Sequence, residues 1–209
     1  MIFKTTVARH RDVAEVEEFS SPVLAHVSEL IKGRRAFSVL DFGKANGETI
    51  QYFSRFDARI CVVDAFDFLV RLSPKVGEKE EVFFRRLRRL AKDYLRLPEG
   101  FSFDLVLCWD GLNYLEPAVL RFLSRFLSLY SGSQTLLHAY FYTRREIPEH
   151  GGDFSVVGHD TVCARYPSAD RKVGHCYAQT ELVKLMEEYK VQKSMLLKNG
   201  IQEYLFSSY

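Results

Sequence analysis

Short runs of apolar residues alternate with helical periods along the middle of the chain. The runs that predict buried strands are 37–42, 60–63, 103–109 and 135–142. Helical spacing of apolar residues follows them in segments 48–56, 66–72, 80–97 and 117–130. Runs that are apolar on both faces are typical of parallel strands covered by helices. We therefore expect an α/β sheet with helices on both of its faces.

The start of the chain shows a different pattern. Apolar residues between Asp12 and Gly33 recur at helical spacing, and Pro22 interrupts them. A proline inside a helical period ends or begins a helix. The pattern predicts two short helices, so we expect residues 1–35 to form an N-terminal helical cap.

The end of the chain predicts a hairpin. The Asn199-Gly200 pair separates two strand-like runs, 191–197 and 201–206, and this dipeptide favours a tight β-turn. The expected fold is a doubly wound, mostly parallel seven-stranded sheet ending in this antiparallel hairpin. Its third strand can be degenerate, because residues 85–92 have the pattern of a helix.

Residues 143–178 interrupt the alternation with a long polar stretch that contains glycines and prolines and shows no long period. A stretch of this length inside a compact domain is usually functional or disordered. We interpret it as an insertion that covers the sheet as a lid. In doubly wound sheets, ligands bind beyond the carboxyl ends of the strands, and the insertion leaves the sheet at that edge.

Length and charge narrow the class of protein. With 209 residues, the chain is expected to form a single domain over residues 1–209. It has 29 Lys and Arg against 27 Asp and Glu, a balance that does not indicate a nucleic-acid partner. No apolar run is long enough to predict a membrane span. The first residues lack the pattern of a secretory signal, so we expect a cytoplasmic protein.

A glycine-containing turn follows the first predicted strand. It reads Asp41-Phe42-Gly43-Lys44-Ala45-Asn46-Gly47 and leads into a helical segment. Glycines allow a sharp turn and a close approach of the backbone to a ligand, and the helix that follows offers free N–H groups. The spacing does not fit the dinucleotide pattern G-x-G-x-x-G, because Glu48 stands where its last glycine would be. Taken alone, the turn can also be a simple strand-to-helix connection.

Together with Asp64 and the run 103–110, this turn resembles the class I S-adenosylmethionine-dependent methyltransferase superfamily. The resemblance covers about Ser38 to Tyr209. The first motif of that family reads acidic-x-Gly-x-Gly-x-Gly, and Ala45 replaces its middle glycine here. The resemblance implies S-adenosylmethionine as cofactor. It assigns the residues around the turn (Asp41, Gly43, Lys44, Ala45 and Gly47) to the cofactor site, and Asp64 to the ribose hydroxyls.

Further cofactor contacts are implied by the same resemblance. An acidic residue before the fourth strand often binds the adenine amino group in relatives, and Asp93 holds a comparable place. Tyr94 either stacks on the base or packs in the core. Trp109, at the end of the fourth strand, either borders the cofactor or belongs to the core.

The acceptor side follows from topology. Asp110, Asn113 and Tyr114 leave the fourth strand where the resemblance places the reacting methyl group. We expect Asp110, Asn113 and Tyr114 to face this group, and Asp110 and Tyr114 to act on the methyl acceptor. Methyl transfer needs proximity and orientation first, so a general base is optional.

The predicted lid contains histidines and cysteines that could form a metal site or supply a general base. His150, His159, His175, Cys163 and Cys176 do not follow the paired spacing of zinc sites, so no metal is expected. His159 is instead a candidate general base. The arginines of segment 85–92 are interpreted as a solvated face rather than as a phosphate site.

Two functions remain open from the sequence. The first is an enzyme that transfers a methyl group from S-adenosylmethionine to a small-molecule acceptor. Outside the sheet and its helices, only short parts of the chain remain to form a substrate pocket. A pocket of this kind suits a small molecule better than a docked macromolecule. The alternative is a catalytically inactive methyltransferase-fold protein that binds ligands or acts as a scaffold, which Lys44 and Ala45 in the glycine turn suggest.

Overall fold

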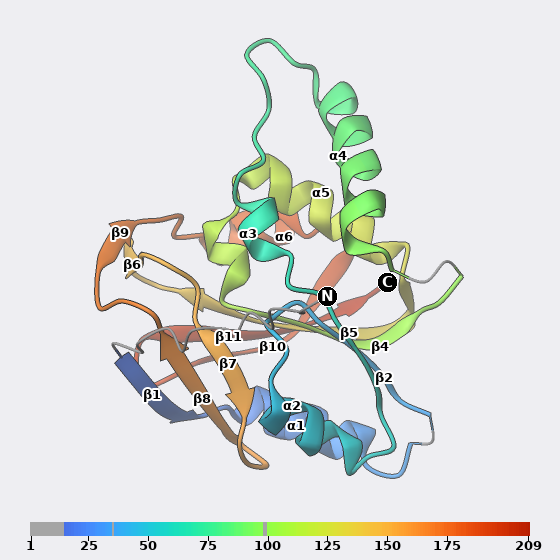
Figure 1. Cartoon of the computed structure of the whole chain (residues 1–209), viewed down its shortest axis with the longest axis vertical. Helices are drawn as coiled ribbons and strands as arrows, with labels where there is room; N and C mark the ends of the chain where they lie inside the picture. Colours follow the sequence, from blue (N-terminus) through green and yellow to red (C-terminus); the bar gives the residue numbers. More distant parts are fainter. Residues whose placement is uncertain (1–14, 35, 98–99) are drawn as a thin grey trace, which may run out of the picture.

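The computed structural model describes residues 15–34, 36–97 and 100–209, and a mixed β-sheet forms its centre (Figure 1). Within these residues the sheet has six strands: β2 (Ser38–Asp41), β3 (Arg59–Val62), β4 (Phe103–Trp109), β5 (Ser131–Tyr142), β10 (Tyr189–Leu196) and β11 (Ile201–Ser208). Their order is β10-β11-β5-β4-β2-β3. Strands β3, β2, β4 and β5 are parallel to one another, β11 is antiparallel to β5, and β10 is antiparallel to β11.

The hairpin predicted at Asn199-Gly200 is confirmed. β10 and β11 pair in antiparallel register, and Gly200 has a φ of +83°, a left-handed conformation that glycine adopts without a steric penalty. The amide of Leu197 donates to the carbonyl of Ile201 at 2.8 Å and closes the turn. Through β11 this hairpin finishes the sheet beside β5.

Helices cover both faces of the sheet, as the apolar runs predict (Figure 1). One face packs against α1 (Pro22–Ile31) and α2 (Gly47–Ser54). The other packs against α3 (Phe66–Leu69), α4 (Glu80–Leu95), α5 (Pro117–Ser128) and α6 (Gln179–Leu185). A short 3₁₀ helix, η1 (Gly111–Tyr114), follows β4 directly. No helix in the described part of the chain is long and apolar enough to cross a membrane.

The seventh strand of the expected sheet is not found among the described residues. Helix α4 occupies the part of the sequence where the family fold has its third strand, and it confirms the helix predicted there. It buries Phe83, Leu87, Ala91 and Leu95. This spacing of four places the side chains on one helical face, which a strand would split between two faces. β3 therefore forms the edge of the sheet.

The prediction of a first N-terminal helix is wrong. Residues Glu15–Ser20 form strand β1, whereas the second expected helix is present as α1. In β1, Phe19 packs edge-on against Tyr140, and Val16 on the opposite face is 61% exposed. Their spacing of three also fits a helix, but these residues form a strand because they pair with β8, a strand 141 to 151 residues further along the chain. The earlier part of the expected cap, residues 1–14, lies outside the described residues.

That partner belongs to the segment interpreted as a lid, whose regular secondary structure consists of four strands. It contains β6 (Glu146–Pro148), β7 (Asp153–Val156), β8 (Thr161–Tyr166) and β9 (Arg171–Val173). Strands β1, β8 and β7 form an antiparallel sheet in that order, and β6 pairs with β9. We call β1, β8 and β7 the accessory sheet. Figure 1 shows it beside α1 and α2, below the main sheet.

Candidate cofactor and substrate site

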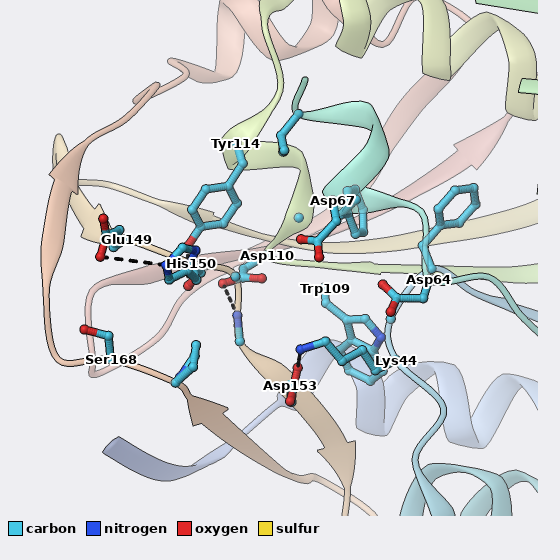
Figure 2. Close-up of a pocket in the computed structure, with 18 of the residues that line it drawn as sticks. Lys44, Asp64, Asp67, Trp109, Asp110, Tyr114, Glu149, His150, Asp153 and Ser168 are labelled. Atoms are coloured by element: carbon cyan, nitrogen blue, oxygen red, sulfur yellow. Dashed lines mark hydrogen bonds and ion pairs between the residues drawn. The ribbon is translucent and has the colours of Figure 1, made fainter. Parts of the chain in front are cut away.

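A cavity of about 700 Å³ lies at the carboxyl ends of β2 and β4 (Figure 2). This is the edge at which doubly wound sheets bind ligands. The main sheet and its loops contribute Phe42, Gly43, Lys44, Asp64, Phe66, Asp67, Val70, Arg71, Trp109, Asp110, Gly111 and Tyr114. The segment 143–178 contributes Glu149, His150, Gly151, Gly152, Asp153, Pro167, Ser168 and Lys172. The predicted insertion therefore forms one wall of the cavity.

Asp41 lies beneath the glycine turn rather than on the cavity wall. Its Oδ1 accepts hydrogen bonds from the Trp109 Nε1 at 2.6 Å and from the Gly43 amide at 2.8 Å. Burial raises the pKa of this carboxyl to about 6, although both hydrogen bonds act in the opposite direction. Asp41 thus joins the ends of β2 and β4 and fixes the start of the turn.

The need for glycine at position 43 comes from the protein itself. A Cβ at this position would lie 2.8 Å from Trp109 Nε1 and 3.0 Å from Asp41 Oδ1. Gly43 therefore lets the turn pass closely over the indole while also lining the cavity. A Cβ at Gly47, in contrast, would meet no atom within 4 Å. Gly47 begins α2, whose N-terminus is capped by Asn46 through bonds to the amides of Glu48 and Thr49.

Trp109 is buried and packs between the two sheets. Its ring stacks on Phe154 of β7 with centroids 5.4 Å apart and an interplanar angle of 8°. Its backbone has a φ of +48°, which is uncommon for a residue with a side chain. This turn of the backbone ends β4 and is followed directly by Asp110.

Asp110 is a buried acid on the wall of the cavity. It is 2% exposed, and its Oδ2 accepts hydrogen bonds from the Tyr142 hydroxyl at 2.8 Å and the Gly152 amide at 3.2 Å. Burial raises the pKa of Asp110 to about 7, and these hydrogen bonds oppose the shift. A carboxyl with this pKa can exchange a proton near neutral pH.

Tyr114 lies next to this acid and forms part of the outer wall of the cavity. Its hydroxyl donates to the carbonyl of His150 at 3.2 Å, and Lys172 Nζ lies 4.7 Å from the centre of its ring. Burial raises the pKa of the Tyr114 hydroxyl, so it remains a neutral hydrogen-bonding group. Figure 2 shows Tyr114, His150 and Glu149 gathered on the side of the cavity opposite Asp64.

Lys44 and Asp153 form an ion pair on the wall of the cavity (Figure 2). Lys44 comes from the glycine turn, and Asp153 is the first residue of β7. The two side chains are 40% and 42% exposed. The pair thus connects the main sheet to the accessory sheet at a place that solvent and ligands reach.

The structure brings together many of the residues that the sequence singled out. Gly43, Lys44, Asp64, Trp109, Asp110 and Tyr114 all line the cavity. Ala45 and Gly47 are exposed in the same turn but do not line it. Asp64 is exposed at the end of β3, and Asp67 stands beside it on α3 (Figure 2).

Other expected site residues lie elsewhere. Asp93 is exposed on α4, and Tyr94 stacks on Phe68 with centroids 4.2 Å apart; neither residue lines the cavity. Both residues belong to α4, the helix that stands where the family fold has its third strand. His159, the candidate base, lies in the turn between β7 and β8 and contacts Glu29 of α1 at 2.9 Å, also outside the cavity.

Asn113 supports the backbone instead of facing the cavity. Its side-chain amide donates to the carbonyls of Asp110 at 2.6 Å and Tyr140 at 2.8 Å, and its Oδ1 accepts from the Tyr142 amide at 2.9 Å. It is 1% exposed. Asn113 therefore holds η1 against β5 and positions the adjoining Asp110.

Residues 149–153 contribute to the cavity as a unit, and no sequence motif had singled them out together. The sequence Glu149-His150-Gly151-Gly152-Asp153 places two adjacent glycines between charged groups. A Cβ at Gly151 would lie 3.3 Å from Asp110 Oδ1, and one at Gly152 would lie 2.9 Å from Phe154 and Tyr166. The glycine pair was a usable signal, because adjacent glycines often mark a close approach of the backbone to other atoms.

Comparisons with known proteins find solved structures with a similar fold but no protein with a similar sequence. No family model and no curated protein matches the chain. The PH0226 protein from Pyrococcus horikoshii OT3 matches with a TM-score of 0.51 and 15% identity, over 90% of each chain. A S-adenosylmethionine-dependent methyltransferase from Clostridium acetobutylicum matches with a TM-score of 0.50 and 11% identity, over 88% of this chain and 89% of that one.

A further match is the 1,6-didemethyltoxoflavin-N1-methyltransferase of Burkholderia thailandensis, with bound 1,6-didemethyltoxoflavin and S-adenosylhomocysteine. Its TM-score is 0.46 and its identity is 16%, over 89% of this chain and 76% of that one. The chain has a mixed α/β fold of doubly wound type. More particularly, it has the fold of S-adenosylmethionine-dependent methyltransferases, which confirms the resemblance at the level of fold.

Proposed function

We propose that this protein binds S-adenosylmethionine in the cavity and transfers its methyl group to a small-molecule acceptor. The observation that carries the proposal is the position of the cavity, at the carboxyl ends of β2 and β4 in a methyltransferase fold. Its volume of about 700 Å³ lies within the range typical of small-molecule sites. Asp64, Gly43 and Asp110 supply polar groups along its length.

Each end of the cavity has its own task in this proposal. Asp64 accepts hydrogen bonds from the ribose hydroxyls, since an exposed carboxylate at the end of the second parallel strand suits a diol. The glycine turn offers backbone at close range. Tyr114 and the residues 149–151 enclose the acceptor. The excess of carboxylates over Lys and Arg on the described walls favours a positively charged ligand.

The chemistry depends first on orientation, and a nearby proton acceptor assists it. S-adenosylmethionine supplies a methyl group on a positively charged sulfur. An acceptor O–H or N–H that gains the methyl group must release its proton. Asp110 takes this proton, because its pKa of about 7 allows it to be ionised before the reaction and protonated afterwards. Tyr142 and the Gly152 amide hold its carboxyl in place.

The test is the affinity of Asp64→Ala for S-adenosylhomocysteine, measured by isothermal titration calorimetry. A hydrogen bond to a charged group contributes about 1.5–3 kcal/mol, so affinity should fall by about 10- to 100-fold. Asp93→Ala is the matched control, because Asp93 is an exposed carboxylate outside the cavity. Equal affinity of wild type and Asp64→Ala would contradict the assignment, and failure of wild type to bind at millimolar ligand would remove the proposal.

A second candidate function is a binding or scaffold protein that has kept the fold without turnover. The ion pair of Lys44 with Asp153 favours it, since the pair already gives the Lys44 ammonium a partner on the cavity wall. The two functions differ in one measurement. An enzyme transfers a labelled methyl group from S-adenosylmethionine to a component of a small-molecule extract, whereas a scaffold binds S-adenosylhomocysteine and transfers none.

A further inference from the structure

The ion pair between Lys44 and Asp153 joins elements that are far apart in the sequence. Lys44 belongs to the turn between β2 and α2, and Asp153 begins β7 of the accessory sheet. Both side chains line the cavity and are about two-fifths exposed. An ion pair with this exposure stabilises the fold little. A ligand with stronger charge complementarity can therefore separate the two side chains.

The chemistry of the pair selects a particular ligand group. One ammonium and one carboxylate standing side by side are the complement of a zwitterion. An α-amino acid group carries an ammonium and a carboxylate on the same carbon. When it enters, each protein charge exchanges one partner for another, and no charge is left unpaired. A ligand with a single charge would leave either Lys44 or Asp153 without a partner.

The position of the pair fits the amino-acid end of the cofactor. In Figure 2, Lys44 and Asp153 lie beside Trp109, with Asp64 on the other side of Lys44. Of the other cations on the described walls, Lys172 lies over the ring of Tyr114 and Arg71 follows α3. Lys44 is the cation that the glycine turn carries. A ligand with its ribose at Asp64 can thus extend along the turn to this pair.

We propose that Lys44 and Asp153 form the receptor for the amino-acid group of S-adenosylmethionine, with Lys44 binding its α-carboxylate and Asp153 its α-ammonium. The inference rests on the proposed function and deepens it. It assigns a cofactor contact to the accessory sheet. It also makes the ion pair a closed form of the site, which opens when the zwitterion replaces the contact between the two side chains.

A set of three ligands separates the roles of the two residues. S-adenosylhomocysteine carries both charges of the amino acid, its decarboxylated analogue keeps only the ammonium, and 5′-methylthioadenosine lacks both. The variants are Lys44→Met and Asp153→Asn, which remove charge at similar side-chain size. Glu187→Gln is the control, because Glu187 pairs with Arg125 at 43% and 44% exposure but lies outside the cavity.

Both variants should bind S-adenosylhomocysteine at least about 10-fold more weakly than wild type in calorimetric titrations. Both should bind 5′-methylthioadenosine as wild type does. The decarboxylated analogue should lose affinity in Asp153→Asn and not in Lys44→Met. Thermal melting reports whether each variant is folded. If one variant does not fold, the ligand series on the other still tests the inference.

The outcomes distinguish this inference from the proposed function. If wild type binds neither S-adenosylhomocysteine nor 5′-methylthioadenosine, both fall. If Asp64→Ala weakens S-adenosylhomocysteine but Lys44→Met and Asp153→Asn behave as Glu187→Gln does, only the receptor is overturned. Equal losses for S-adenosylhomocysteine and 5′-methylthioadenosine would also overturn it, because the variants would then act on the cavity rather than on the amino-acid end.

Discussion

At the scale of single residues, the acid Asp110 combines full burial with a place on the wall of an open cavity. Its neighbours explain both properties. Tyr142 and the Gly152 amide donate hydrogen bonds to the carboxyl, and a Cβ on Gly151 would lie 3.3 Å from it. The segment that covers Asp110 therefore excludes water without supplying a cation. The protonated form of the acid is favoured as a result.

This raised pKa has a consequence for stability. An acid with a pKa of about 7 in the fold and about 4 in the unfolded chain holds its proton more tightly when folded. Its contribution is fully present below pH 4 and is lost as the pH rises through 7. Asp110→Asn removes this dependence. Its free energy of unfolding, relative to wild type, should be higher at pH 8 than at pH 5, by up to about 2.5 kcal/mol.

Urea denaturation at the two pH values measures this difference. Asp93→Asn is the control, since Asp93 is exposed. Its free energy of unfolding should differ from that of wild type by the same amount at both pH values. A wild type and an Asp110→Asn variant that change in parallel between pH 5 and pH 8 would contradict the raised pKa.

Residues at strand ends could be predicted from the sequence, because the parallel topology alone brings those ends together. Asp64 and Asp110 are examples. His159 could not be predicted in this way, because its position depends on the pairing of β7 with β8, and it contacts Glu29 instead of the cavity. Asp93 and Tyr94 were assigned by analogy with the loop before the fourth strand of relatives, and here they lie on α4.

At the scale of elements, strand β11 supports helix α1 through Glu203. The carboxylate of Glu203 is fully buried and accepts hydrogen bonds from the Val23 amide at 3.1 Å, the Leu24 amide at 3.2 Å and His138 Nε2 at 2.8 Å. The Ser21 hydroxyl also donates to it. Free amides at a helix N-terminus need an acceptor. A residue from the last strand of the chain supplies it here.

Removing this acceptor should destabilise the fold strongly. Burial raises the pKa of Glu203, but the hydrogen bonds from His138, Ser21 and Val23 outweigh burial and lower it overall. Glu203→Ala leaves buried donors without a partner. We expect the free energy of unfolding at pH 7 to fall by about 3–5 kcal/mol, as measured by urea denaturation.

Glu187→Ala provides the comparison for Glu203→Ala. It removes a carboxylate from a half-exposed ion pair, for which we expect a loss below about 1 kcal/mol. Losses of similar size in the two variants would show that Glu203 does not support α1 in this way.

The elements themselves could be predicted unevenly. β2, β4 and the terminal hairpin have strong local signals, namely apolar runs and an Asn-Gly turn. Strand β1 has no such signal, because it pairs with β8 from the other half of the chain. Helical spacing over six residues is too short to exclude a strand, and only the pairing decides between them.

At the scale of the whole molecule, aromatic side chains join the main sheet to the accessory sheet. Phe154 of β7 stacks on Trp109 of β4 and on Tyr140 of β5, with centroids 5.4 Å and 5.5 Å apart. These side chains belong to the same buried cluster as Val23 of α1. The wall of the cavity that comes from segment 143–178 is therefore anchored to the core at β7. Figure 1 shows this sheet beside the helices of the same face.

Trp109 is the only tryptophan in the sequence, which gives the molecule a built-in fluorescent reporter at its most informative point. Its indole N–H donates to Asp41, whose pKa is raised by burial to about 6. A hydrogen bond to a carboxylate is stronger than one to a neutral acid. The emission of the intact protein should therefore change with a midpoint near pH 6, and Asp41→Asn should abolish that transition. An unchanged titration in Asp41→Asn would assign it to another group. Because the same indole borders the cavity, its fluorescence also reports the binding of a ligand there.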